Sequence, residues 1–196
     1  MKNWDRLADS VINGYDIGEV EAEEILQAPN EDLLPLMNAA YKIRSTYYGN
    51  KIKLNMIKNV KSGYCPENCS YCSQSIDSTA SIDKYTMLTK EEIIAGAKRA
   101  NELQSGTYCI VASGRGPTNR ELNIITEAVE EIKAMYPKMK ICACLGILRD
   151  GQGQRLKEAG VDRYNHNLNT SKAHYSSIAT THTYDDRVAT VTDVKE

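Results

Sequence analysis

Three cysteines in one short stretch are the residues of this 196-residue sequence best suited to chemistry. Cys65, Cys69 and Cys72 follow the spacing C-x3-C-x2-C, which curls the backbone so that three sulfurs can converge on one point. Thiolates are soft ligands suited to iron–sulfur clusters, zinc or Cu(I). Zinc usually takes four ligands from paired groups, and no second pair lies at finger-like distance. The spacing therefore favours a cubane cluster with one iron open to a substrate or cofactor.

The cysteine stretch and two later segments resemble a known family. C-x3-C-x2-C with Tyr71 before its last cysteine is similar to the signature of radical S-adenosyl-L-methionine (SAM) enzymes. Residues 64–75, 108–113 and 164–171 narrow the resemblance to biotin synthases, and it runs from about Asn3 to the last residue. The alternative, a disulfide framework, needs a secretory setting that this sequence does not indicate.

The resemblance implies a 4Fe-4S cluster on Cys65, Cys69 and Cys72. In radical SAM enzymes the open iron chelates SAM, and one electron then cleaves SAM to give a 5′-deoxyadenosyl radical. The protein binds, orients and excludes water, while the cofactor supplies the hard chemistry. Tyr71 stands where the family places an aromatic side chain near the adenine; from spacing alone, it equally fits a packed tyrosine in a crowded loop.

Two further cysteines lie inside apolar segments. From the pattern alone, Cys109 and Cys142 are small buried hydrophobic residues, as most free cysteines are. The resemblance instead implies that both hold a second, 2Fe-2S cluster, completed in the family by a cysteine and an arginine from later strands that would fall beyond Glu196. Cys144 shares the strand parity of Cys142, and we expect it to have a packing role.

Asn165, Asn167 and Asn169 alternate along the expected fourth strand, so their amides would share one face. Carboxamides both donate and accept, so they could bind ribose hydroxyls or a cyclic urea; the alternative is an asparagine-rich turn. The resemblance implies SAM ribose contacts for Asn167 and Asn169, and substrate contacts for Asn165 or Asn167. His166 has the opposite parity, and we expect it to be structural, together with His174 and His182.

The resemblance also implies a reaction and its partners. Dethiobiotin would be the substrate, with sulfur from the 2Fe-2S cluster inserted between a methyl and a methylene carbon. An electron donor such as a flavodoxin or ferredoxin, and a homodimer, would complete the system. Two alternatives stay open: another radical SAM reaction, which needs the cysteine loop but not the second cluster, and a truncated cluster-binding product without turnover.

Composition excludes several functional classes. The hydrophobic content of 41% and the charged content of 26% are ordinary for a globular protein. A net charge of −2 gives no electrostatic reason to expect binding to nucleic acid or to an anionic membrane. No apolar run approaches the ~18 residues of a spanning helix, and the first residues do not open a signal peptide. Six cysteines without an export signal indicate a reducing compartment, so we predict a cytoplasmic location.

The element pattern predicts two domains, a helical segment over 1–50 and an α/β domain over 51–196. Capping boxes open expected helices at 89–92 and 118–121, a short helix surrounds Leu156, and the last helix begins at 183–186. The expected strands are 54–60, 108–112, 140–145 and 161–166. Four strand–helix units in a row favour a parallel sheet with right-handed crossovers, as in a (β/α) TIM-type barrel.

Only about 140 residues follow Met56, whereas a full barrel of eight units takes ~250. We therefore expect the first four units of a barrel, with its functional loops at the carboxyl ends of the strands. Such a half-barrel would leave the inner sheet face uncovered. We expect the chain alone to dimerise through that face or to be loosely packed.

Overall fold

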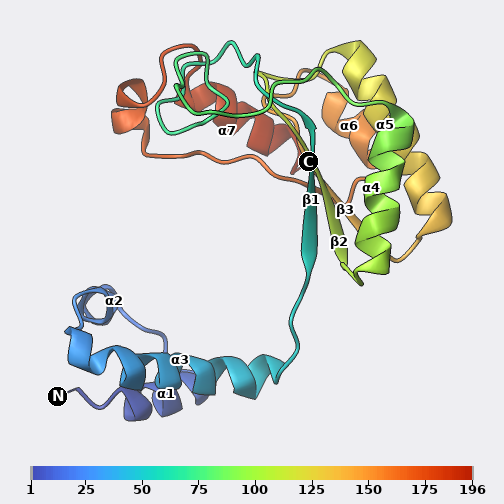
Figure 1. The fold of residues 1–196 in the computed structure, drawn as a ribbon. Helices are drawn as coiled ribbons and strands as arrows, with labels where there is room; N and C mark the ends of the chain where they lie inside the picture. Colours follow the sequence, from blue (N-terminus) through green and yellow to red (C-terminus); the bar gives the residue numbers. More distant parts are fainter. Residues whose placement is uncertain (1, 196) are drawn as a thin grey trace. The chain divides into compact units, whose positions relative to one another are not determined.

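The computed structural model describes residues 2–195 and divides into two compact units, one up to Ile52 and the other from Lys53 onward. Each unit has a hydrophobic cluster of its own. The two units are therefore described separately (Figure 1).

The first unit is helical, as the sequence predicts. Its elements are α1 (Trp4–Ile12), α2 (Glu19–Leu26), the 3-10 helix η1 (Asn30–Asp32) and α3 (Leu33–Tyr48). The Asn3 side chain caps α1 by accepting a hydrogen bond from the Arg6 amide at 2.9 Å. At the start of α3 the Asp32 side chain makes no capping hydrogen bond. Trp4, Ala8 and Ala39 form the small core.

The second unit is a four-stranded parallel sheet with the order β1-β2-β3-β4. Its strands are β1 (Asn55–Lys61), β2 (Thr107–Ala112), β3 (Lys140–Cys144) and β4 (Arg163–Tyr164). Its helices are α4 (Lys90–Glu102), α5 (Asn119–Met135), α6 (Gln152–Ala159), the 3-10 helix η2 (Lys172–Ser177) and α7 (Tyr184–Asp193). Within the described residues the sheet is open, with β1 and β4 at its edges. The predicted α/β fold of four strand–helix units is confirmed.

Short sequence signals determine where the helices begin. Thr89, Thr118 and Thr183 each accept a hydrogen bond from the backbone three residues later, and the acidic side chain there bonds back. These reciprocal bonds satisfy amides that a helix start otherwise leaves without partners. All three predicted caps are therefore present at α4, α5 and α7.

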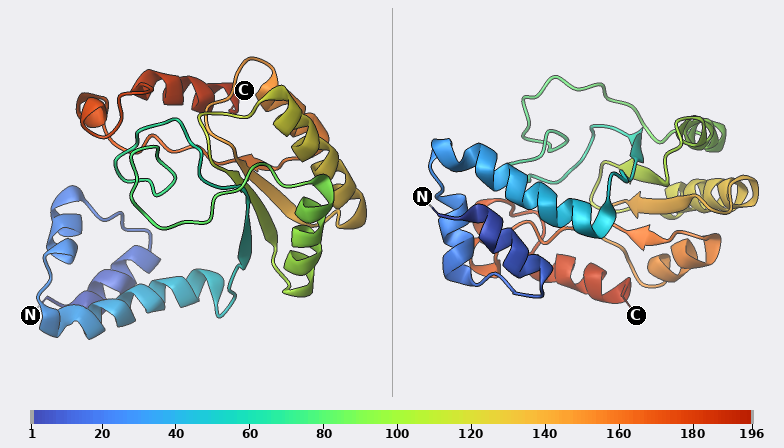
Figure 2. Two further views of the ribbon diagram at one scale, coloured as in Figure 1. Left: turned by 45° about the horizontal axis from the view of Figure 1, so that its top comes forward. Right: turned by 90° about the horizontal axis from the view of Figure 1, so that it is seen from below.

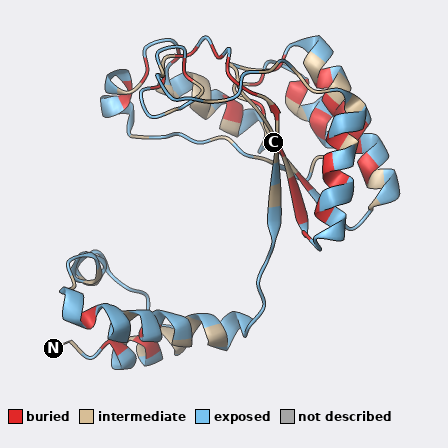
Figure 3. Cartoon of the chain, in the orientation of Figure 1, coloured by how far each residue is buried: buried red, intermediate tan, exposed pale blue. Residues whose placement is uncertain are grey.

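The core of the second unit lies between the sheet and helices α4, α5 and α6, which run along one sheet face (Figures 1 and 2). Buried residues follow the sides of these helices that face the strands (Figure 3). In α5 the buried residues Leu122, Ile125, Val129 and Ile132 recur at helical spacing. Gly96 of α4 leaves room for the Tyr108 side chain, whose hydroxyl donates to the Ile93 carbonyl at 2.8 Å.

The fourth strand is shorter than the sequence predicts. Only Arg163 and Tyr164 pair with β3, and the chain from Asn165 onward leaves the sheet after one last bond from the Asn165 amide to the Ala143 carbonyl (2.7 Å). β3 itself ends at Cys144 and turns at Gly146, whose φ of +91° is left-handed. β4 therefore pairs with β3 only as far as Ala143, one residue before β3 ends.

Helices that could cross a membrane are absent from the part of the chain that the structure describes.

Candidate functional site

The cysteine loop begins with a sharp turn at the carboxyl end of β1. Gly63 and Tyr64 have φ values of +68° and +52°, so two successive left-handed residues redirect the chain. The Ser113 hydroxyl, from the end of β2, donates to the Gly63 carbonyl at 2.6 Å and holds the turn. The loop therefore leaves the sheet in a fixed direction, on the face where functional loops of α/β barrels lie.

The three cysteines of the loop line one cavity of about 400 Å³. Cys65 and Cys69 are buried, each 8% exposed, and Cys72 is half-buried. The Cys72 amide donates to the Cys69 carbonyl at 3.1 Å in a tight turn. Tyr71 lines the same cavity, and its side chain is largely exposed.

Burial and one arginine have opposite effects on the pKa of the loop cysteines. Burial raises the pKa of the Cys65 and Cys69 thiols, which disfavours the thiolate in the free chain. At Cys69 the positive charge of Arg187 opposes this shift. A metal or cluster deprotonates the thiols that it binds, so binding must overcome the cost of burial.

The asparagines predicted for the site line the same cavity, although not for the predicted reason. Asn165, Asn167 and Asn169 lie beyond β4 in a loop, so strand alternation does not place them. Asn169 has a φ of +69°, a conformation that asparagine tolerates better than most residues. The Asn167 carbonyl accepts a hydrogen bond from the Arg187 guanidinium at 2.9 Å.

His166 was expected to be structural but also lines the cavity. Among residues 2–195 its Nε2 is one of few buried side-chain atoms without a hydrogen-bond partner. Burial, with a further contribution from Arg187, lowers the pKa of His166 to about 4, so its imidazole is neutral at physiological pH. His182, also expected to be structural, is buried beside the cysteine loop and lines the cavity too.

Sequence reasoning missed three charged residues of the cavity wall, namely Glu67, Arg115 and Arg187. Glu67 lies inside the cysteine motif itself, and a carboxylate between thiolate ligands is a signal that could have been noticed. Arg115 lies between two glycines in the loop that follows β2. Arg187 lies in α7, far along the sequence, and only the fold brings it to the cavity.

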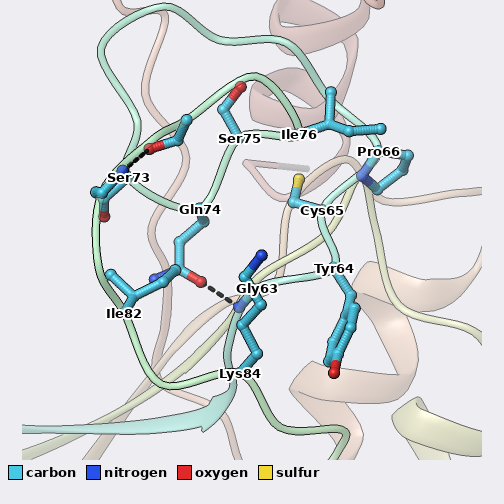
Figure 4. A pocket seen from close by; sticks show the side chains of 12 residues that line it. Gly63, Tyr64, Cys65, Pro66, Ser73, Gln74, Ser75, Ile76, Ile82 and Lys84 are labelled. Atoms are coloured by element: carbon cyan, nitrogen blue, oxygen red, sulfur yellow. Dashed lines mark hydrogen bonds between the residues drawn. The ribbon is translucent and has the colours of Figure 1, made fainter.

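A smaller cavity of about 320 Å³ adjoins the loop, between residues 63–66 and the segment from Ser73 to Lys84 (Figure 4). The Gln74 side-chain oxygen accepts a hydrogen bond from the Gly63 amide and fixes this segment to the turn. Cys65 and Gln74 line both cavities, so the cysteine loop forms the wall between them.

The convergence of the three loop sulfurs on one cluster stays a prediction. No group of three or more His, Cys, Asp or Glu side chains within the described part of the chain could hold a single metal ion. The three cysteines line one cavity. In an iron–sulfur cluster each thiolate binds a different iron, so cysteines that do not share a single metal ion can still hold a cluster.

A second thiol group lies on the sheet. Cys109 and Cys142 are direct partners in the register of β2 and β3, and both are half-buried. Ile57 and Arg163 continue the same row on the two edge strands. Burial and the neighbouring Cys109 raise the pKa of Cys142 to about 11. Cys144 pairs with Val111 one row nearer the large cavity, which it lines.

The family follows from a sequence comparison that covers most of the second unit. Residues 59–196 match the profile of the radical SAM superfamily. This chain belongs to the radical SAM superfamily. Radical SAM proteins use a four-iron cluster and SAM, and the three cysteines on one cavity wall fit the cluster.

Within the radical SAM superfamily, the chain is similar to several biotin synthases. It is 64% identical to biotin synthase of Lysinibacillus sphaericus, over 99% of this chain and 58% of that protein. It is 59% identical to biotin synthase of Geobacillus thermodenitrificans, over 100% of this chain and 59% of that protein. The chain therefore spans somewhat more than half the length of these relatives.

Solved structures are also similar to this chain in fold. Methylornithine synthase superposes with a TM-score of 0.81 at 24% identity, over 96% of this chain and 55% of that chain. A maturase of the [FeFe]-hydrogenase superposes with a TM-score of 0.73 at 21% identity, over 98% of this chain and 43% of that chain. At this identity the similarity shows the fold alone.

Proposed function

We propose that this chain carries the cofactor site of a biotin synthase, which inserts sulfur at two C–H positions of dethiobiotin in the last step of biotin formation. The loop that carries Asn165, Asn167 and Asn169 is called the asparagine loop. The observation that carries the proposal is that the cysteine loop and the asparagine loop line one cavity. The identity of 59–64% to biotin synthases supports the same reaction.

In this proposal Cys65, Cys69 and Cys72 hold the 4Fe-4S cluster. When bound, the cluster and SAM supply the one-electron chemistry that breaks unactivated C–H bonds. The chain binds and orients these groups. Tyr71 would lie beside the adenine, and Arg187 offers a positive charge to a carboxylate.

The asparagine amides would make the polar contacts to cofactor and substrate. Asn167 and Asn169 would bond to ribose hydroxyls, and Asn165 or Asn167 to the cyclic urea of dethiobiotin. A carboxamide suits both partners because it offers two donors and an acceptor. His166, neutral because of its burial, leaves an unpartnered nitrogen that a bound ligand could satisfy.

Cys109 and Cys142 would hold the 2Fe-2S cluster that supplies sulfur. Their pairing across neighbouring strands supports this role, because two thiols on one sheet face can bind the same small cluster. Cys144 lies one pleat away and is left as a packing residue.

We also propose the wider setting. The reaction needs an electron donor, for which a flavodoxin or a ferredoxin is suited, and we expect the active enzyme to be a homodimer. The six cysteines, all within residues 2–195, are free thiols, which supports a reducing compartment such as the cytoplasm.

Anaerobic reconstitution tests the proposal directly. We expect iron and sulfide from both clusters in the unaltered chain, and loss of the four-iron signal and of SAM cleavage in Cys69→Ala, because two thiolates hold a cubane poorly. We expect the two-iron absorption to disappear in Cys109→Ala and Cys142→Ala.

Cys144→Ala is the matched control, since it removes a neighbouring thiol from the same sheet face. Its two-iron absorption should match that of the unaltered chain. Zinc without iron at the cysteine loop would overturn the proposal. A retained two-iron signal in both Cys109→Ala and Cys142→Ala would instead favour another radical SAM reaction.

A further inference from the structure

Glu67 lies between two proposed cluster ligands, yet its side chain turns away from solvent and is only 7% exposed. Its carboxylate accepts hydrogen bonds from the Thr181 hydroxyl at 2.6 Å and from Nδ1 of the His182 ring. Arg115 pairs with the other carboxylate oxygen at 3.4 Å. All of these partners come from other loops, so Glu67 ties the cysteine loop to distant segments.

The hydrogen-bond partners of His182 determine which of its ring nitrogens donates. Arg187 Nε–H is shared between the Tyr175 hydroxyl at 2.6 Å and His182 Nε2 at 3.2 Å. A guanidinium cannot accept a hydrogen bond, so Nε2 must be the unprotonated nitrogen. The ring proton then lies on Nδ1 and is donated to Glu67. One buried imidazole thus links an anion on one side to a cation on the other.

Arg187 continues this link to the loop that follows β4. Its guanidinium donates to the Asn167 carbonyl at 2.9 Å. A single chain of hydrogen bonds therefore runs from Glu67 in the cysteine loop, through His182 and Arg187, to the loop that carries the asparagines.

The residue next to Glu67 makes a parallel clamp. The Asn68 side-chain oxygen accepts from the amides of Thr180 and Thr181 at 2.9 and 3.2 Å, and its nitrogen donates to the Thr180 hydroxyl at 2.6 Å. The Ser70 amide also donates to the Ile178 carbonyl at 2.9 Å. The segment 178–182 is thus held along the whole first half of the cysteine loop.

We propose that Glu67 and His182 are positioning residues that set the cysteine loop and the asparagine loop in one fixed geometry before a ligand binds. Buried polar networks whose members are all satisfied specify a single arrangement. The inference rests on the proposed function only where it names SAM as the ligand that spans the two loops.

Four variants separate the two contacts of His182, one to Glu67 and one to Arg187. Glu67→Ala removes the anion, whereas Glu67→Gln keeps an oxygen that accepts from His182. His182→Asn keeps an amide near the Nδ1 position but loses the contact to Arg187. His182→Gln places its amide near the Nε2 position and loses the contact to Glu67. Glu121→Gln is the control, because Glu121 is a partly buried carboxylate paired with Lys61 outside this network.

The first measurement is amide hydrogen exchange on the full chain without a cluster, with the Ser70 amide as reporter. We expect its exchange to rise at least about tenfold in Glu67→Ala and His182→Gln, and to stay near that of the unaltered chain in Glu67→Gln and His182→Asn. The second measurement is calorimetric titration of the cluster-loaded chain with SAM. We expect affinity to fall about 10- to 100-fold in Glu67→Ala and both His182 variants, and not in Glu121→Gln.

The outcomes distinguish this inference from the proposed function. Ser70 exchange that is unaltered in every variant would overturn the positioning role. A rise that is uniform over all amides, and no larger at Ser70 than elsewhere, would also overturn it. If the unaltered chain takes up neither cluster nor SAM, the proposed function fails, and the Ser70 measurement still decides the inference. The inference is established if Ser70 exchange rises in Glu67→Ala and His182→Gln and stays near that of the unaltered chain in Glu67→Gln and His182→Asn.

Discussion

At the scale of single residues, Asn167 is held in the asparagine loop by its main chain, which leaves its side chain free to contact a ligand. Arg187 holds Asn167 by its backbone carbonyl, and the Asn167 side chain lines the cavity. The position of this residue therefore does not depend on its own amide. A substitution there removes a polar contact to a ligand without releasing the loop.

We accordingly predict that Asn167→Ala weakens the binding of SAM or dethiobiotin by about 1–3 kcal/mol, because a buried polar partner on the ligand loses its hydrogen bond. Calorimetric titration of the cluster-loaded chain measures the change. The Ser70 amide exchange should be unaffected, since the clamp to the cysteine loop is intact. Unchanged affinity for both ligands would assign Asn167 to a turn role.

The residues of the site differ in how far the sequence could reveal them. The loop cysteines are recognisable because their spacing is local, and the asparagines because a family motif carries them. Glu67 and His182 are far apart in sequence and meet only through the fold, so no local pattern pairs them. Strand parity cannot place His166, since parity holds only inside a strand and β4 ends at Tyr164; its structural role stays a prediction.

At the scale of elements, local chemistry predicted helices better than strands. Capping boxes are complete within four residues, so the starts of α4, α5 and α7 could be predicted. The length of a strand depends on its neighbour as well as on its own residues, and β4 pairs with β3 only as far as Ala143. The sequence alone shows which residues could form a strand, but not how many of them pair with the neighbouring strand.

Asp162 joins these elements just before β4. Its carboxylate accepts hydrogen bonds from Lys133 of α5 at 2.6 Å, from Lys140 at 2.7 Å and from the Ile141 amide at 2.8 Å. Burial alone would raise the pKa of Asp162, but these donors outweigh it and hold the pKa at about 2. The charged form is thus the one that stabilises the fold.

We predict that Asp162→Asn lowers the free energy of unfolding at neutral pH by about 1–3 kcal/mol. Because the pKa of Asp162 is depressed from 3.8 to about 2, its contribution is present above pH 3.8 and is lost as the pH falls toward 2. The difference between variant and unaltered chain should therefore shrink over that range in urea unfolding.

Asp185→Asn is the matched control for this experiment. Asp185 pairs with Lys172 at 2.7 Å, but both side chains are about two-thirds exposed, at 66% and 68%. Exposed pairs contribute about 0–1 kcal/mol, so this variant should barely change stability at any pH. A loss in Asp162→Asn that persists at pH 2 would contradict the electrostatic explanation.

At the scale of the molecule, the sheet face opposite α4, α5 and α6 is the part that the expected half-barrel leaves uncovered. Ile57 on this face is 67% exposed, whereas Cys109, Val111, Cys142 and Cys144 are half-buried. Association of the chain through this face stays a prediction from the sequence. The open sheet itself was predictable, because four strand–helix units cannot close a barrel.

The two units also differ in how much apolar surface they bury. The first has three buried core residues, Trp4, Ala8 and Ala39, while the cluster of the second includes most of the buried faces of α4 and α5. Stability rises with buried apolar area, so a small core opens first. Trp4 is the single tryptophan of the sequence and is 4% exposed, which makes it a reporter for the first unit alone.

We predict that tryptophan fluorescence changes at a lower urea concentration than amide protection is lost in β2 and β3. Ala8→Gly in α1 should lower the free energy of unfolding of the first unit by about 1 kcal/mol, because glycine is a poor helix former. Only the midpoint of the fluorescence transition should therefore shift. Ile132→Val in α5 should affect only the strand amides, by about 0.5–1.5 kcal/mol, through a lost buried methylene. Coincident transitions that both variants shift together would show instead that the two cores unfold as one cooperative unit.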